Sequence, residues 1–214
     1  SGGAAGGAAA MTGGVANIRR GSSLVVGIGE SAVLTAGDDI AIKADATVDT
    51  SNADAVPTAF AASGGLVSGA GAVARVVTER DIDIAIGEAA RLESGDGDDI
   101  EIRAEETAET RAKALGATFG GVALGGTVAF ARHETDIDIA FEGPTRPVLT
   151  GGDVTIVGRR DGGVDAEATA AAGGAFAGNG VDTTAEDDAR VTIDLGRADF
   201  QTAGRTIEIA ARNS

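Results

Sequence analysis

Two pairs of aspartates with three nearby arginines are the sequence's main candidate for catalytic chemistry. Carboxylates and guanidinium groups gathered on one face could bind and cleave an acidic polysaccharide. Grooves that cleave sugars usually also present aromatic side chains, whereas this chain has six Phe, no Trp and no Tyr. We therefore favour a solvated face whose mutual repulsion prevents sheets from associating sideways. The residues are Asp81, Asp83, Asp136, Asp138, Arg75, Arg80 and Arg132.

The segment SGDGDDI, residues 94–100, is the candidate metal site. It looks like part of the calcium-binding nonapeptide repeat, in which aspartate oxygens in glycine-rich turns ligate Ca²⁺. The match ends at Glu101, where the nonapeptide has an apolar residue, and no second copy follows at nonapeptide spacing. We favour a Gly-Asp turn with solvated carboxylates. If calcium binds, the predicted ligands are Asp96, Asp98 and Asp99.

His133 is the only histidine, and the chain has no cysteine. Disulfide bonds, thiolate metal sites and histidine-rich metal sites are therefore excluded. A Ser-His-Asp triad would need a serine nucleophile beside the histidine. We predict instead that His133 is a solvated side chain near the start of a strand, and we predict no catalytic residue and no cofactor.

The candidate residues lie on segments with the alternation of β-strands. In DIDIAIGE, residues 81–88, isoleucine alternates with aspartate or a small residue, and DDIEIRA at 98–104 repeats the alternation. A period of two places alternate side chains on opposite faces of a strand. The isoleucines are therefore predicted to face a core and the aspartates to face water.

The same pair of strands recurs four times along the chain. Ile28, Ile86, Phe141 and Leu195 occupy equivalent positions at spacings of 58, 55 and 54 residues. Short strands with one apolar face can bury that face by stacking, as in repeat proteins. We therefore predict an all-β fold, a parallel β-helix (β-solenoid) built from four ~55-residue repeats, each supplying two or three coils. A β-sandwich is the alternative, although it does not predict a fourfold repeat.

The chain is predicted to form a single repeat domain, residues 1–214. Its approximate modules are 1–58, 59–115, 116–170 and 171–214.

One segment has the composition of a helix. EETAETRAKALG, residues 105–116, contains strong helix formers and ends in a glycine suited to a helix C-terminus. Its counterparts at 43–50 and 164–171 alternate Ala or Val with polar residues. We therefore predict a strand here.

The charge balance restricts the partners. With 33 acidic against 17 basic residues the net charge is −16. Nucleic acid and anionic lipid need clustered cations, so neither is expected to bind. No apolar run reaches the ~18 residues that span a bilayer, so no membrane insertion is predicted. We find no signal-peptide pattern and interpret the sequence as a segment of a longer protein.

The run GGVANI…LVVGIGESAVLTAGDDIAIKADA, residues 13–46, resembles the repeats of very large bacterial surface proteins of the filamentous-haemagglutinin and autotransporter-adhesin type. Those repeats alternate an Ala/Gly-rich strand, an Ile-Gly-x-Gly-Ala-like strand and a Gly-Asp-Val-x-Val-x-Ala strand. The fourth copy departs most, because DTTAEDDA at 182–189 replaces its apolar strand. The matching pieces are IGESAV (28–33), IGEAAR (86–91), GDDIAIKA (37–44), GDDIEIRA (97–104) and GGDVTIVG (151–158).

The resemblance implies a secreted β-helical stalk that displays adhesive surfaces on the bacterial cell. Our leading hypothesis is therefore a non-catalytic structural or adhesive stalk segment. The alternatives are a polysaccharide-active β-helical enzyme and a calcium-stabilised extracellular repeat module. Expected partners are neighbouring repeats of a longer parent chain and a host-surface or glycan ligand. Because no cap is visible at either end, end-to-end self-association is also expected.

Overall fold

A computed structural model describes residues 1–48, 56–95, 97–202 and 206–214. Across these residues every regular element is a β-strand, as predicted. The segment 105–116 lies inside a strand, so the prediction against a helix is confirmed. The longer strands are β1 (Gly2–Ile28), β3 (Ile40–Val48), β4 (Thr58–Ile86), β6 (Ile100–Phe141), β8 (Val154–Asp194) and β10 (Ile207–Asn213). The short strands are β2 (Val33–Thr35), β5 (Arg91–Glu93), β7 (Val148–Gly151) and β9 (Asp199–Thr202).

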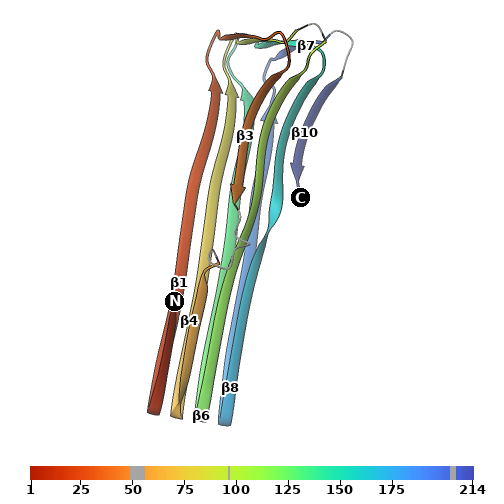
Figure 1. Ribbon diagram of the computed structural model, residues 1–214. Coiled ribbons are helices and arrows are strands. Elements are labelled where there is room, and N and C mark those ends of the chain that lie inside the picture. Colours follow the sequence, from red (N-terminus) through yellow and green to blue (C-terminus); the bar gives the residue numbers. More distant parts are fainter. Residues whose placement is uncertain (49–55, 96, 203–205) are drawn as a thin grey trace.

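The strands form two parallel sheets. In the larger sheet the order is β1-β4-β6-β8-β10, with β3 also paired to β6, and in the smaller sheet it is β2-β5-β7-β9. Figure 1 shows the long strands side by side, with β1 at one side of the stack and β10 at the other. Every pairing between described strands is parallel. The β-sandwich alternative is therefore wrong, because its sheets are antiparallel.

Paired residues lie one predicted repeat apart. Ile28 pairs with Ile86, and Ile86 pairs with Phe141. In the next strand Ile139 pairs with Ile193. A stretch of 53–60 residues therefore supplies one layer of the stack, and the expectation of two or three coils per repeat is wrong.

The layers are long because β6 and β8 double back on themselves. Glu106 and His133, both in β6, are in side-chain contact, and Arg160 and Asp187 make the same kind of contact within β8. In β6 the chain reverses near Gly120, where an added Cβ would lie 2.1 Å from the carbonyl oxygen of Gly65. We call the halves before and after this reversal the outgoing arm and the returning arm, and we use the same names for the halves of β1, β4 and β8 that are in register with them. Only glycine allows the neighbouring backbones this close approach.

The core lies between the outgoing and returning arms and has two parts. Near the short strands it is built from isoleucines; Ile82 and Ile84 are both 1% exposed. Toward the reversals it is built from alanines such as Ala72 and Ala129. Asp81, between the inward positions, is exposed. The predicted alternation is confirmed here, and the small alanines allow the two arms to approach closely.

Candidate functional site

The predicted aspartate pairs are neighbours on the outer face of the returning arms. Asp81 pairs with Asp136, and Asp83 pairs with Asp138. Together with Arg190 and Thr192 they line a shallow hollow. Partial burial raises the pKa of Asp83, and the charges of Asp138, Asp81 and Asp136 raise it further. The four carboxylates therefore repel one another across adjacent strands.

Only two of the three predicted arginines lie on the same outer face. Arg80 points inward, where its Nε lies 3.3 Å from Oε1 of the buried Glu106. Arg75 and Arg132 remain on the outer face and line a second hollow. Of the carboxylates and cations considered for polysaccharide chemistry, Arg80 is therefore removed from the outer face, and the others line two separate hollows.

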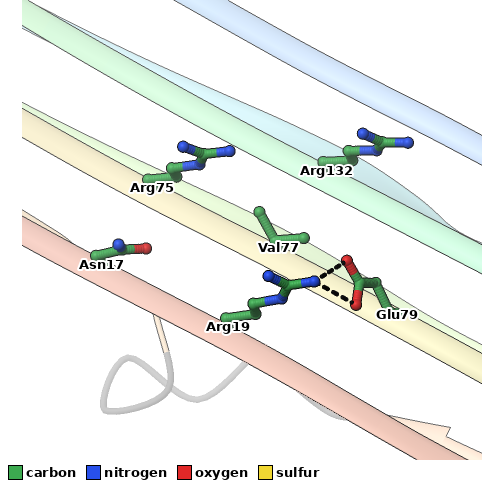
Figure 2. Close-up of a pocket in the computed structure, with 6 residues that line it drawn as sticks. All are labelled: Asn17, Arg19, Arg75, Val77, Glu79 and Arg132. Carbon is green, nitrogen blue, oxygen red and sulfur yellow. Dashed lines mark hydrogen bonds and ion pairs between the residues drawn. The ribbon is translucent and has the colours of Figure 1, made fainter.

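The second hollow has a volume of about 340 Å³ and draws an arginine from each of three adjacent strands. These are Arg19 of β1, Arg75 of β4 and Arg132 of β6, as Figure 2 shows. Asn17, Val77 and Glu79 complete its lining.

The charges of this hollow are largely compensated within the chain. Arg19 forms hydrogen bonds of 2.8 and 3.0 Å to both carboxylate oxygens of Glu79. Arg132 lies 3.0 Å from Glu134 and 3.9 Å from Glu186. The guanidinium carbon of Arg75 instead lies 4.9 Å from the centre of the Phe130 ring, a cation–π contact. The hollow thus offers hydrogen-bond donors without a large net positive charge.

His133 is not the solvated side chain that the sequence suggested; it is 0% exposed. Its Nε2 lies 3.2 Å from Glu106 and 2.6 Å from the hydroxyl of Thr135, while its Nδ1 lies 3.2 Å from Thr110. The hydroxyl of Thr135 also donates to Glu106 at 2.5 Å. Because an ionised carboxylate can only accept, Nε2 of His133 carries a proton.

A polar cluster between the arms joins the two arms of β6 to each other and to the neighbouring strand β4. Its members are Glu106, His133, Thr135, Thr110 and Arg80. Burial by itself would raise the pKa of Glu106. The hydrogen bonds from His133 and Thr135, with the charges of His133 and Arg80, hold that pKa below its ordinary value. In the next layer the buried guanidinium of Arg160 lies 2.7 Å from the carboxylate of Asp187, whose side chain is 36% exposed. The alternation along the strands places these polar residues at inward-facing positions, and this could have identified them from the sequence. Our prediction did not use it.

The candidate calcium turn contains a ladder of aspartates. The backbone N–H of Asp99 donates to the carboxylate of Asp39 at 2.8 Å, and that of Asp153 donates to Asp99 at 2.9 Å. Thr206 continues the ladder by donating to Asp153. Each carboxylate therefore accepts a hydrogen bond from the following layer.

Of the predicted calcium ligands, Asp96 lies outside the described residues, and Asp99 belongs to this ladder. Over the parts of the chain that the structure describes, no group of three or more His, Asp or Glu residues is arranged to hold a metal ion. The calcium site stays a prediction.

The described residues also contain no helix long and apolar enough to cross a membrane. No family model, curated protein or solved structure matches this chain.

Proposed function

We propose that this chain is a β-solenoid segment that serves as a non-catalytic spacer or adhesive stalk in a larger secreted bacterial surface protein. The observation that carries the proposal is the unbroken register of equivalent side chains through successive layers. Ile42 pairs with Ile102 across neighbouring strands, and Ile102 pairs with Ile156. Ile156 in turn pairs with Ile209 of β10. Because every layer presents the same column to the next, layers can be added without a new core, which suits an extended stalk.

Two further observations support the non-catalytic part of the proposal. The single histidine is sealed between the arms, where no solute can reach it. Arg80, the arginine nearest the aspartate pairs in sequence, is held inside by Glu106. The outer carboxylates Asp81 and Asp83 therefore have a charge-repelling role that fits a surface kept free of sideways association.

The adhesive part of the proposal assigns display to the outer face of the returning arms. The arginine-lined hollow and the aspartate pairs both lie on this face, on β4 and β6. A host-surface or glycan ligand bearing carboxylates or sulfates would find hydrogen-bond donors in the hollow.

Single-molecule force spectroscopy tests the spacer role. The chain is pulled from its two ends, and we expect stepwise release of layers. Each layer of 53–60 residues should add about 190 Å of contour length. Extension in one event would contradict the layered stalk. Depolymerisation of an acidic polysaccharide that is lost in Asp81→Ala would contradict the non-catalytic role.

A further inference from the structure

The end of the molecule that holds the reversals is formed by segments without charged side chains. It is the end of the long strands remote from the short strands, the lower end in Figure 1. We call it the uncharged end. In a chain with a net charge of −16, it is set apart from the acidic remainder. The segments without an acidic or basic residue are 1–18, 56–74, 114–131 and 168–181.

Large apolar side chains are exposed on the uncharged end, on the outer face of the returning arms. They include Val67 and Val73 of β4, and Val122, Leu124 and Val128 of β6. Both of these strands are paired on both sides, so the exposure belongs to the face of the sheet and not to an edge. An apolar surface of this kind marks an interaction site.

The outward side chains of this surface lie in rows that cross the strands. Val73 and Val128 are in register and form a ridge on the side of the charged residues. Met11 and Leu124 rise on the side of the reversals, where they line a hollow of about 320 Å³. Between the two ridges the middle row is glycine in all four layers. Its members are Gly13, Gly71, Gly126 and Gly180.

We propose that two copies of this chain pair through this surface, face to face and antiparallel. The two-fold axis runs along the middle row, so each layer faces the same layer of the other copy. The ridge at Val128 then lies against the ridge at Leu124 of the second copy, and Phe130 lies against Val122. The inference rests on the exposed side chains of the face and not on the proposed stalk role.

The distribution of charge favours this arrangement of the two copies. Gly126 lies midway between the reversal at Gly120 and the first charged residue, Arg132. Rotation about Gly126 therefore lays uncharged end on uncharged end, and the carboxylates from Glu134 to Asp138 extend past the other copy. A parallel arrangement would set these carboxylates against each other, and a longer antiparallel overlap would bury them against apolar side chains.

Two charged side chains of each copy fall within the overlap. Arg75 faces Val67 of the second copy, on which its alkyl stem packs while its guanidinium group stays at the hollow that it shares with Arg19 and Arg132. Asp182 faces Gly178, which has no side chain. Neither charge lies opposite another of the same sign, so the overlap contains no direct repulsion.

The size of the surface suits a reversible dimer. Side chains on one face of a strand repeat about every 6.6 Å, and neighbouring strands are about 4.8 Å apart. The five outward positions from Val122 to Phe130, on the four long strands, therefore cover about 600 Å² on each copy. The total of about 1,200 Å² lies at the lower limit of specific interfaces. A lipid bilayer could also meet an apolar end, but matching ridges favour a rigid partner.

Sedimentation velocity of the 214-residue chain over a range of concentrations tests the proposal. We expect a monomer–dimer equilibrium that shifts toward the dimer as salt screens the repulsion between two acidic molecules. Leu124→Glu places a charge on the apolar ridge and should weaken the dimer by at least about tenfold. Val25→Glu is the matched control and should leave the association unchanged. Val25 is 63% exposed, as Leu124 is, and lies outside the overlap.

A double variant tests the register of the two copies. In Leu124→Glu with Val128→Lys, each new carboxylate faces the new ammonium group of the other copy. Within one chain the two positions are about 13 Å apart along the strand and do not meet. We expect this variant to dimerise more tightly than Leu124→Glu with Val25→Lys, which has the same net charge. Circular dichroism of each variant establishes that the fold is retained.

A chain that stays monomeric at every soluble concentration would overturn the proposal, including one that instead floats with phosphatidylcholine vesicles. So would a dimer that Leu124→Glu does not weaken, or that Val25→Glu weakens equally. A double variant no tighter than its control would contradict the register of the pairing. These outcomes leave the force measurement on single molecules unaffected, so failure of the dimer and failure of the stalk role are distinguishable.

Discussion

At the scale of single residues, Glu106 is a carboxylate only 1% exposed in an interior built mainly of aliphatic side chains. A buried carboxylate is stable only when donors and a counter-charge replace its water. Thr135 and His133 supply the donors from the returning arm, and Arg80 supplies the charge from the preceding layer. The cluster therefore fastens the two arms of β6 together inside an otherwise aliphatic interior.

We expect Glu106→Gln to lower the free energy of unfolding by about 2 kcal/mol, because the charged acceptor for three groups is lost. Urea denaturation followed by circular dichroism measures the change. Glu134→Gln is the matched control, because Glu134 is about half-exposed beside Arg132 and its replacement should cost less than about 1 kcal/mol. Equal effects of the two substitutions would contradict the role given to Glu106.

The same variant should alter the pH dependence of stability. The pKa of Glu106 is lower in the folded chain than its ordinary value of 4.5. Its contribution is therefore fully present above that value and is lost as the pH falls through the lower folded pKa. We expect the wild type to lose more stability than Glu106→Gln when the pH is lowered from 6 to 3.

At the scale of elements, the reversal in β6 sets the length of both arms. Gly120 is close-packed against the backbone of Gly65 in the preceding layer, and Gly174 in the following layer approaches Gly120 in the same way. The reversals therefore stack on one another, and this stacking keeps the side-chain columns in register.

We expect Gly120→Ala to destabilise the chain by about 2 kcal/mol or more, because its Cβ would overlap the carbonyl oxygen of Gly65. Gly126→Ala is the matched control; a Cβ at Gly126 meets no atom within 4 Å. Thermal denaturation compares the two variants. A control variant that is destabilised as much as Gly120→Ala would show that helical or strand propensity, rather than close packing, decides the effect.

The alternation in residues 81–88 was sufficient to predict which side chains face the core, because a strand has a fixed period of two. The strand at 105–116 followed from its counterparts and was confirmed. The number of coils per repeat was predicted wrongly. The sequence contains many glycine pairs, and nothing local distinguishes the reversal at Gly120 from a glycine within an arm such as Gly126.

The polar sites were less predictable than the strands. Arg80 lies two residues before the inward-facing Ile82, so the period of two places it on the inward face as well. We instead grouped the arginines by their closeness in sequence and did not use this period. His133 was missed because its partner Glu106 lies on the opposite arm, 27 residues away. Only the position of the reversal brings the two together.

At the scale of the whole molecule, in-register stacking of the layers places like charges opposite each other on the outer face, for example Asp81 opposite Asp136. These like charges repel one another. The whole chain carries a net charge of −16, and the carboxylates of that face would repel a second acidic molecule that approaches it sideways.

One repeat supplies one layer of the stack, and pairs of cysteines introduced into this cysteine-free chain measure that register. Asp81 and Asp136 are paired across neighbouring strands, so their Cα atoms lie about 4.8 Å apart, within disulfide range. Asp138 is offset from Asp81 by two residues, which places it beyond about 7 Å. We expect the chain carrying Asp81→Cys with Asp136→Cys to form an internal disulfide on mild oxidation. The chain carrying Asp81→Cys with Asp138→Cys should remain reduced. A bridge in the second variant, or in neither, would contradict the register that pairs Asp81 with Asp136.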